Sequence, residues 1–411
     1  MATTEKALPP PPSTTLRGRV AASYQKAQNV FNKPGDGKPN NMRRIIVYAV
    51  VGVLIVVVII VGAVVGTQKR GSSSGGGGSN GGSNGGNSGQ GFPLDSRLHN
   101  SFWGLAYTPY GAIDCTATQA NVTKDMQLLS QLTTRLRLYA SDCNVTALVL
   151  QAIQDLNVNM SIYAGIYIHP DVESYNSQVA QLDFALKSYG VDRVDGVTVG
   201  NEYLLNAPSR GDTIANATTW LISRINDFKT HLRQATASSP DQHHNYSSIP
   251  VGTSDAAGTF IGDSSLVSAV DYFQVNIHPW FSQNTYEQAA WFSWSYMNNI
   301  VQPLVNATWP MPVNSTAQNP RLFQGEFGWP TDTDDAALGI NPAGSRAGLT
   351  ELQRVLDDWV CASNRNGTKY FFFEAFDESW KKMYGGVEQH WGLFYENKTL
   401  KAINIPDCPH D

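Results

Sequence analysis

Two glutamates each end a short apolar run that is typical of a buried strand. Glu202 ends the run VGNE at 199–202, and Glu326 lies in QGEFGWP at 324–330. Two carboxyl groups carried by two strand ends are suited to cleaving a glycosidic bond. One can protonate the bridging oxygen while the other attacks or stabilises the anomeric carbon. The pattern therefore predicts glycosidase chemistry, provided that both strands face one pocket.

The elements around these glutamates alternate between strand-like runs and helices with apolar residues at a period of 3.6. Eight strands are predicted at 102–107, 135–139, 161–168, 194–200, 249–253, 272–277, 322–325 and 370–374. Helices are predicted between them at 119–132, 145–156, 172–189, 215–236, 287–305 and 345–362. This alternation indicates an α/β fold, a (β/α)8 TIM barrel, with a doubly wound open sheet as the alternative.

Polar residues gather where the predicted strands end. Barrel enzymes carry their sites at the carboxyl ends of the strands, so this placement predicts a functional face. The residues at these positions are Tyr107, Tyr139, Glu202, Asp255, His278, Glu326 and Glu374.

An apolar segment near the amino terminus is long enough to cross a membrane. Residues 45–66 carry no charge over 22 positions, which is about 33 Å as a helix, and a bilayer core is about 30 Å thick. A cleaved signal peptide is the alternative, but its apolar core is only about 7–15 residues long. Because 44 residues precede the segment, we predict an uncleaved transmembrane signal-anchor.

The predicted orientation places the long carboxyl-terminal part outside the cell. Before the span, eight basic residues face two acidic ones, which favours a cytoplasmic amino terminus, although Lys69 and Arg70 beyond it weaken that argument. Asn-x-Ser/Thr glycosylation acceptors occur only after the span. The nine acceptors are Asn121, Asn144, Asn159, Asn216, Asn245, Asn306, Asn314, Asn366 and Asn397. We therefore expect a single-pass type II protein of the plasma membrane, with its catalytic domain facing the cell wall.

All four cysteines follow the span, in the compartment where disulfides persist. Three pairings are possible. We favour Cys115 with Cys143 and Cys361 with Cys408, because each pair is close in sequence. The second bond would also tie down the carboxyl terminus.

The composition divides the chain into four parts. Residues 1–44 are predicted to be a disordered cytoplasmic tail, and 45–66 the membrane anchor. The Gly/Ser/Asn-rich stretch at 67–91 is predicted to be a flexible linker with a reach of about 25 Å. Residues 92–411 are long enough for one barrel domain. After Arg70 there are 19 basic and 32 acidic residues, a formal charge of −13. This charge is a poor match for nucleic acid, so a neutral polysaccharide is the expected partner.

Several motifs together resemble glycoside hydrolase family 17, within the large clan of retaining glycosidases. The motifs are GLAY at 104–107, RLRLY at 135–139, VGNE at 199–202, NIHPWF at 276–281, GEFGWP at 325–330 and FEAFDESWK at 373–381. The resemblance covers 102–396. With its tail, span and linker, the whole chain resembles the membrane-anchored fungal glucan endo-1,3-β-glucosidases of that family.

The resemblance implies a role for each matching residue. Glu202 matches the acid/base and Glu326 the nucleophile of a double displacement, which requires carboxyl groups about 5–5.5 Å apart. Asn201 is expected to bond the sugar 2-hydroxyl. Behind the nucleophile the resemblance implies a supporting charge network, in which an ammonium keeps Glu326 ionised. Its members are Glu378, Lys381 and Glu388. Glu374 and Asp377 belong to the fungal version of the last motif, more as substrate contacts than as catalytic groups.

Aromatic residues fall into two groups by position. Rings at strand ends or in the following loops can stack on a pyranose, and those on strand starts or helices are expected to pack in the core. The predicted sugar-binding rings are Tyr107, Tyr139, Trp280, Phe281, Trp329 and Trp380, and the packing rings are Trp103, Trp220, Trp291, Trp294 and Trp359. His278 can be read either as a substrate contact or as a structural histidine.

Three functions fit the sequence. The first is a retaining endo-hydrolase of β-1,3-glucan that remodels the cell wall, and the second is a β-1,3-glucan transglycosylase with the same two glutamates. The third is a catalytically silent wall-binding anchor. A barrel glycosidase of β-mannan or cellulose is a further alternative, against which the GEFGWP and FEAFDE motifs argue. No metal or cofactor site is predicted, and His243–His244 lacks other ligands at metal spacing. No oligomeric interface is indicated, since the small-residue spacing Gly62 to Gly66 is a weak signal.

Overall fold

The computed structural model describes residues 91–238, 245–259, 264–282, 284–312, 315 and 317–410. The predicted tail, the apolar segment at 45–66 and the linker up to residue 90 lie outside this part, as do His243–His244 and Asn314. Within the described residues, no helix has the length and apolar character that a membrane span requires.

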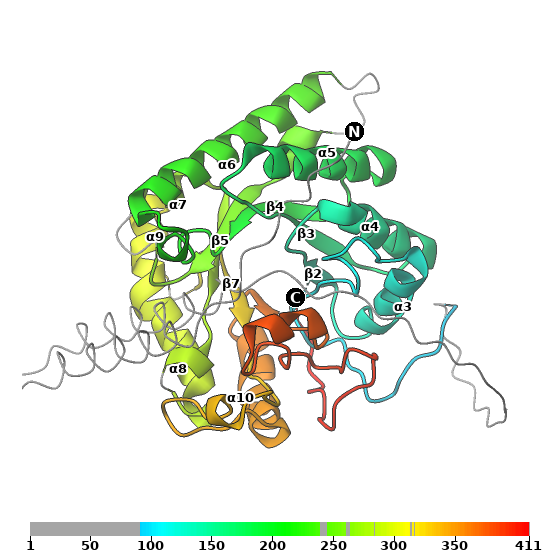
Figure 1. Cartoon of the computed structure of the whole chain (residues 1–411), viewed down its shortest axis with the longest axis vertical. Helices are drawn as coiled ribbons and strands as arrows, with labels where there is room; N and C mark the ends of the chain where they lie inside the picture. The colour runs from blue at the N-terminus through cyan, green and yellow to red at the C-terminus, as the bar shows by residue number, and fades with distance from the viewer. Residues whose placement is uncertain are drawn as a thin grey trace, which may run out of the picture.

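Eight parallel strands form a closed barrel in sequence order, with β1 paired to both β2 and β8. The strands are β1 Leu105–Ala106, β2 Arg135–Arg137, β3 Ser161–Ile166, β4 Val194–Asn201, β5 Val251–Ala256, β6 Tyr272–Asn276, β7 Leu322–Phe327 and β8 Tyr370–Phe372. Figure 1 shows the helices arranged around them. The predicted TIM barrel is confirmed, and the open-sheet alternative is wrong.

Helices connect consecutive strands on the outside of the barrel. They are α3 Gln119–Leu129, α4 Val145–Leu156, α5 Val172–Tyr189, α6 Ile214–Ala237, α7 Ser264–Ala269, α8 Ala289–Tyr296, α9 Gln302–Thr308 and α10 Leu349–Arg365. The helix predicted at 287–305 is interrupted by a π-helical turn, Met297–Val301, between α8 and α9. The short α7 was not predicted, because its six residues are too few to show a helical period.

The helix predicted at 345–362 begins later, at Leu349. Ser345 instead belongs to a loop, where its backbone N–H donates to Asn341 Oδ1 at 2.9 Å. Its hydroxyl accepts a bond from the backbone N–H of Tyr286 at 3.1 Å. The side chain that would have opened the helix thus holds two loops of the catalytic face together.

Large aromatic rings fill the interior of the barrel below the strand ends. Tyr163 lies with its ring centroid 5.4 Å from that of Tyr272, 5.5 Å from that of Phe323 and 5.4 Å from that of Phe371. Space for these rings comes from a glycine on the neighbouring strand, since a Cβ at Gly252 would lie 2.2 Å from the Tyr272 ring. The packed rings make a rigid floor on which the polar strand ends are held.

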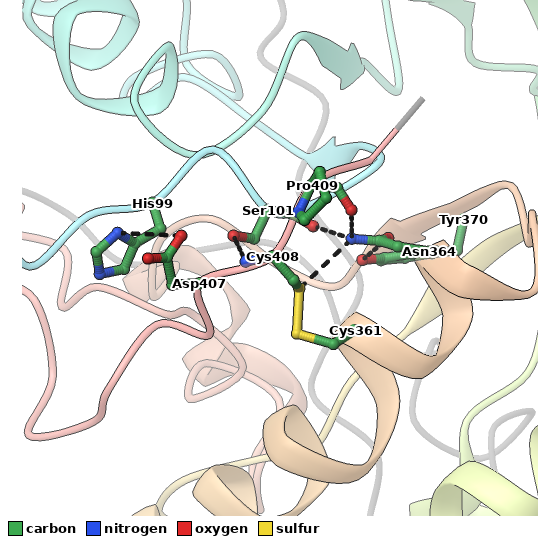
Figure 2. Close-up of a disulfide and its surroundings, with 8 residues drawn as sticks. All are labelled: His99, Ser101, Cys361, Asn364, Tyr370, Asp407, Cys408 and Pro409. Atoms are coloured by element: carbon green, nitrogen blue, oxygen red, sulfur yellow. Dashed lines mark hydrogen bonds and ion pairs between the residues drawn. A yellow bond between two sulfur atoms is a disulfide. The ribbon is translucent and has the colours of Figure 1, made fainter.

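Both predicted disulfides are present. Cys115–Cys143 joins the loop after β1 to the loop after β2. Cys361–Cys408 joins α10 to the carboxyl-terminal segment, as Figure 2 shows. Around the second bond, Asn364 Nδ2 donates to the backbone oxygens of Ser101 and Pro409 at 2.7 and 3.0 Å. The carboxyl terminus is therefore fastened to the start of the barrel.

The glycosylation acceptors in the described part do not lie in the core. Six are exposed: Asn144, Asn159, Asn216, Asn245, Asn366 and Asn397. Asn121 and Asn306 are half-buried. Their modification remains a prediction, and their positions are compatible with it.

Candidate active site

Glu202 and Glu326 both lie at irregular points of their strands. The register of β4 with β5 shifts between Thr198 and Asn201, and Gly200 has a φ of 85°. Glu202, directly after β4, has a φ of 51°. The register of β7 likewise shifts, so that Glu326 pairs with Asn276 of β6. Such irregularities re-aim side chains, and here they direct both carboxyl groups toward one polar cluster.

Asn276 contacts the surroundings of both carboxyl groups. Its amide nitrogen donates to Glu202 Oε1 at 3.0 Å, and its amide oxygen accepts from Ser254 Oγ at 3.0 Å and from Arg137 Nη1 at 3.3 Å. The same Nη1 lies 3.0 Å from Glu326 Oε1. The two predicted carboxyl groups therefore lie in one connected polar cluster at the carboxyl ends of the strands.

Glu326 is held by three donors. Arg137 Nη1 and the Tyr139 hydroxyl each donate to its Oε1 at 3.0 Å, and His278 Nε2 lies 2.8 Å from its Oε2. Burial alone would raise the pKa of Glu326, but Arg137, His278 and Tyr139 outweigh it and lower that pKa to about 2. Glu326 is therefore ionised at neutral pH. His278, which the sequence left between two roles, orients this carboxylate.

Glu202 has the opposite electrostatic environment. Burial, and after it the negative charge of Glu326, raises its pKa to about 8, against the lowering effect of the Asn276 hydrogen bond. The segment after Glu202 is fixed by Asp255, whose carboxylate accepts the backbone N–H groups of Leu204 and Leu205 at 2.7 and 3.1 Å. The site thus contains one protonated and one ionised carboxyl group at neutral pH, as an acid and a nucleophile require.

Arg137, like Asn276, is a site residue that the sequence did not reveal. Its side chain is 1% exposed, and it also donates to the backbone oxygen of Gly325, to Asn201 Oδ1 and to Ser254 Oγ at 2.6, 2.6 and 2.9 Å. The signal that could have revealed it is an arginine inside a short apolar strand, because a fully buried arginine almost always has a partner. Asn201, expected to bond a sugar hydroxyl, has its amide oxygen occupied by Arg137, and its partners on a ligand remain a prediction.

The supporting charge network forms, but its lysine pairs with two other glutamates and not with Glu326. Lys381 Nζ lies 2.8 Å from Glu374 Oε1 and 3.1 Å from Glu378 Oε2, whereas the cation paired with Glu326 is Arg137. The prediction that Lys381 keeps Glu326 ionised is therefore wrong in its cation. Burial raises the pKa of Glu388, and the positive charge of Lys381 partly offsets this rise.

Glu374 does not have the position predicted for a substrate contact. Its side chain is buried, and both of its oxygens accept hydrogen bonds from Lys381 at 2.8 and 2.9 Å. Burial and the neighbouring Glu378 raise its pKa. Asp377 is bonded by Lys401 at 2.6 Å. Each of the two acidic residues of the fungal motif is thus held by a lysine, Lys381 for Glu374 and the buried Lys401 for Asp377.

Half of the predicted sugar-binding rings are buried in the fold. Tyr107 donates its hydroxyl to Asp125 Oδ2 at 2.8 Å, and Trp329 donates its indole N–H to the backbone oxygen of Arg346 at 3.0 Å. Trp280 is also buried and packs on Trp329, with centroids 5.3 Å apart. These three rings offer no free face, so the prediction of stacking is wrong for them.

The remaining predicted rings are partly accessible. They are Tyr139, Phe281 and Trp380, which are half-buried. In the group expected to pack, Trp103 and Trp359 are buried, and Trp220 and Trp294 pack against the core from half-buried positions. Trp291 is the exception, because 66% of it is exposed on α8. The position of Trp291 along α8 could not separate it from a buried neighbour, because this helix has apolar residues on all sides.

A family model, the BtgE/BtgC glycoside hydrolase domain, matches residues 104–392. The chain belongs to this family. This stretch contains both glutamates and every residue of the polar cluster described above.

Among the described residues, no group of three or more His, Cys, Asp or Glu side chains could hold a metal ion.

Two relatives carry the name btgC, in agreement with the family model. The chain is 35% identical over 331 residues to a protein of Aspergillus niger that is named putative glucan endo-1,3-β-glucosidase btgC, covering 76% of this chain and 45% of that protein. The btgC protein of Emericella nidulans is 35% identical over 328 residues, covering 76% of this chain and 47% of that protein. The chain thus spans about half the length of these relatives.

Solved structures share the barrel. A family 17 β-1,3-glucanosyltransferase of Rhizomucor miehei is 26% identical, with a TM-score of 0.57, covering 74% of this chain and 97% of that chain. An active-site mutant of that enzyme in complex with laminaritriose is 25% identical, with a TM-score of 0.58, covering 75% and 98%. An endo-laminarinase of Formosa, 19% identical with a TM-score of 0.56 and covering 75% and 92%, shows the likeness of fold alone.

Proposed function

We propose that this chain is a retaining glycoside hydrolase that acts within β-1,3-glucan chains. The observation that carries the proposal is the polar cluster around Asn276 and Arg137. In it, burial and the charge of Glu326 keep Glu202 protonated, while Arg137, His278 and Tyr139 keep Glu326 ionised. Two carboxyl groups with pKa values moved in opposite directions in one site are the signature of an acid and a nucleophile.

The reaction runs in two steps. In the first, Glu326 attacks the anomeric carbon and Glu202 gives its proton to the leaving glycosidic oxygen, so that a glycosyl ester forms on Glu326 as the glycosidic bond breaks. In the second, Glu202 takes a proton from water, and the resulting hydroxyl group displaces Glu326. Configuration at the anomeric carbon is inverted twice and thus retained.

The substrate class is supported from two sides. The relatives with 35% identity are named as glucan endo-1,3-β-glucosidases, and the mutant of the Rhizomucor miehei enzyme binds laminaritriose. The negative formal charge of the chain also suits a neutral polysaccharide better than an anionic one.

Transfer to a sugar acceptor is the second candidate. It is favoured by the likeness to the β-1,3-glucanosyltransferase, which covers nearly all of that chain. In this version a sugar hydroxyl replaces water in the second step, and Glu202 takes its proton. A silent wall-binding anchor is disfavoured, because a binding module needs no cluster that gives two carboxyl groups opposed pKa values.

Product analysis tests the proposal. The full chain, purified in detergent, is incubated with defined linear β-1,3-gluco-oligosaccharides, and the mass and linkage of the products are followed over time. Products that are only shorter indicate hydrolysis, and products longer than the substrate indicate transfer. A newly formed reducing end in the β configuration, seen by proton NMR, indicates retention.

Two variants and one control assign the carboxyl groups. We expect Glu202→Gln and Glu326→Gln to lose activity by more than about a hundredfold, because each removes a group of the chemical step. Glu173→Gln changes an exposed glutamate on α5 and should behave like the parent. Activity of both site variants within a few-fold of the parent would remove the assignment.

We also propose that the enzyme is held at the plasma membrane as a single-pass type II protein and remodels the cell wall. The support is the uncharged segment at 45–66, the acceptors confined to the part after it, and the linker that follows. Protease added to intact cells should remove the catalytic domain and leave an amino-terminal tag protected inside. Protection of the catalytic domain instead would contradict this orientation.

A further inference from the structure

A hairpin near the carboxyl terminus presents one of the predicted glycosylation acceptors at its tip. The hairpin is closed by an antiparallel bridge between Phe394 and Leu400, and the backbone N–H of Tyr395 donates to the oxygen of Thr399 at 3.0 Å. Asn397 lies at the turn between these two arms and is exposed. The reaction proposed above gives this hairpin no role.

The side chain of Asn397 is held in one orientation by the turn. Its amide oxygen accepts the backbone N–H of Thr399 at 3.0 Å, a bond that asparagine commonly makes to the residue two positions later in a turn. Because the oxygen faces the turn, the amide nitrogen on the other side of the same carbon faces away from it. That nitrogen is the atom to which an N-linked glycan is attached.

Tyr395 and Thr399 flank Asn397 on the outer face of the hairpin. Exposure alternates along the chain, since Tyr395, Asn397 and Thr399 are exposed whereas Phe394 and Leu400 are buried. Successive side chains of paired extended segments point to opposite faces. The ring of Tyr395 and the side chain of Thr399 therefore lie on the solvent side, next to each other across the hairpin.

The Tyr395 ring is supported from below and open above. Lys401, which is buried, places its Nζ 5.5 Å from the centroid of this ring. Tyr395 is nonetheless 45% exposed, so the face turned away from Lys401 is accessible. An apolar ring face of this kind suits the C–H face of a pyranose.

Asn397 differs from the other acceptors in having this ring. Among the nine acceptors of the sequence, it alone has a phenylalanine, tyrosine or tryptophan two positions earlier. In the hairpin that position lies beside the tip, so the first sugar attached to Asn397 is placed to pack on the Tyr395 ring.

The hairpin joins two segments of the catalytic face. Glu396 Oε1 accepts the backbone N–H of Ser379 at 3.1 Å, in the segment after β8. Lys398 pairs with Asp125 of α3 and donates to the backbone oxygen of Asn121 at 3.1 Å. Lys398 also has a φ of 70°, a left-handed conformation that a residue other than glycine adopts at a cost. A further contact at the tip would therefore stabilise both the turn and the join that it makes.

We propose that Asn397 carries an N-linked glycan whose first N-acetylglucosamine packs on the exposed face of Tyr395 and fastens the hairpin. In this modification Asn397 Nδ2 loses a proton and bonds to C1 of the sugar, while the bond from C1 to a phosphate oxygen of a lipid-linked donor breaks and the lipid diphosphate leaves. The inference rests on the proposed orientation of the domain outside the cytoplasm, where such transfer takes place, and not on the proposed reaction with glucan.

The first measurement is the occupancy of each acceptor. The full chain is expressed in a secreting eukaryotic host, purified in detergent and treated with an endoglycosidase that leaves one N-acetylglucosamine on every occupied asparagine. Mass spectrometry of its peptides then shows which asparagines carry the sugar. We expect the peptide with Asn397 to carry it in most molecules.

Thermal unfolding of the trimmed full chain measures the contact with Tyr395. We expect Asn397→Gln to lower the Tm by about 1–3 °C, the size of shift that one additional contact gives in a large domain. In a Tyr395→Ala background the same change should lower the Tm by less than about half a degree, because the ring is already absent. Comparing the two backgrounds cancels the direct effect of losing the contact between Tyr395 and Lys401.

Two further variants separate packing on the ring from other effects. Tyr395→Phe keeps the ring and should keep the full loss caused by Asn397→Gln. Asn216→Gln removes another exposed acceptor, on α6, and whatever shift it causes should be the same with and without the Tyr395 ring.

Each outcome decides the proposal. An occupied Asn397 with a loss that depends on the ring supports it. An occupied Asn397 with equal losses in both backgrounds overturns it, and so does a bare Asn397 on chains that carry sugars at other acceptors. Either of these two results leaves the proposed orientation standing. Chains with no sugar at any acceptor would contradict the proposed orientation, and this inference with it.

Discussion

Replacing Arg137 by glutamine should move the acid limb of the pH–rate profile to higher pH. Arg137 Nη1 lies 3.0 Å from Glu326 Oε1, with both side chains almost fully buried. Its positive charge favours the ionised carboxylate, which is the nucleophilic form. Activity is lost as the pH falls through the pKa of Glu326, so a variant that raises this pKa loses activity at a higher pH.

The magnitude follows from the distance. Two unit charges about 4 Å apart interact by about 4 kcal/mol at an effective dielectric constant of 20, which corresponds to about three pKa units. His278 and Tyr139 still donate to Glu326 in the variant, and water can enter the vacated space. We therefore expect an upward shift of about one to two pH units in the acid limb of kcat/KM.

The assay is kcat/KM on a β-1,3-gluco-oligosaccharide at closely spaced pH values from about 1.5 to 7, so that the acid limb of the parent lies within the range. Arg137→Lys is the matched control, because it keeps the charge and loses the fork that also bonds Asn201 and Ser254. We expect a lower kcat in the control but an acid limb within about half a unit of the parent. A folded Arg137→Gln protein with the acid limb of the parent would refute this account of Glu326.

Two further predictions concern stability. Changing Cys361 and Cys408 together to serine opens a loop with a sequence separation of 47 residues, which corresponds to about 4 kcal/mol in the chain-entropy model, and a thermal unfolding scan should show a fall of several degrees. Replacing Lys401 by methionine removes its 2.6 Å bonds to Asp377 and Thr331 and should cost about 3–5 kcal/mol in chemical denaturation. Adding Asp377→Asn should recover part of that loss, and no recovery would mean that the stranded carboxylate is not its cause.

The barrel could be predicted from the sequence because the same strand-and-helix pattern recurs along the chain. Eight apolar runs with helices between them leave few alternatives, and an error in any one run does not change the fold. Strand bounds were less certain. The run at 102–107 forms a strand only at Leu105–Ala106, with an isolated bridge from Phe102 to Thr133. A strand of a closed barrel ends where the neighbouring strand ends, and no local pattern records that length.

The catalytic carboxyl groups were easier to find than the groups that tune them. Glu202 and Glu326 stand out because a charged residue at the end of an apolar run needs a reason. Arg137 lies on β2, and the residues it contacts lie on β4, β5, β6 and β7. Which of several buried polar residues meet depends on the curvature of the whole barrel. This explains why the sequence suggested Lys381 as the cation for Glu326 when Arg137 fills that place.

The orientation of the aromatic rings could not be predicted from the sequence for a similar reason. A ring at a strand end can face the substrate or turn under the loops, and the choice depends on which polar partner its edge finds. Tyr107 donates a hydrogen bond to Asp125, which is paired in turn with Lys398. Trp329 donates one to the backbone oxygen of Arg346. None of these partners is near its ring in sequence, so strand position alone could not separate these rings from Tyr139.

The charge of Glu326 should itself help to set the pKa of Glu202 through the reaction. After burial, this charge is the largest cause that raises the pKa of Glu202 to about 8. When the glycosyl ester forms, Glu326 loses its charge, so the pKa of Glu202 should fall and the spent acid should become a competent base.

Glu326→Gln imitates this uncharged state and permits a direct test. The carboxyl carbon of Glu202, titrated by NMR in the full chain, should show a lower pKa in this variant than in the parent. The fall should be partial, because burial remains. Glu388→Gln is the matched control, since it removes a nearby carboxyl group that is not among the named causes of the shift at Glu202. An unchanged pKa in Glu326→Gln would mean that burial alone keeps Glu202 protonated, and the second step would then need another source for its base.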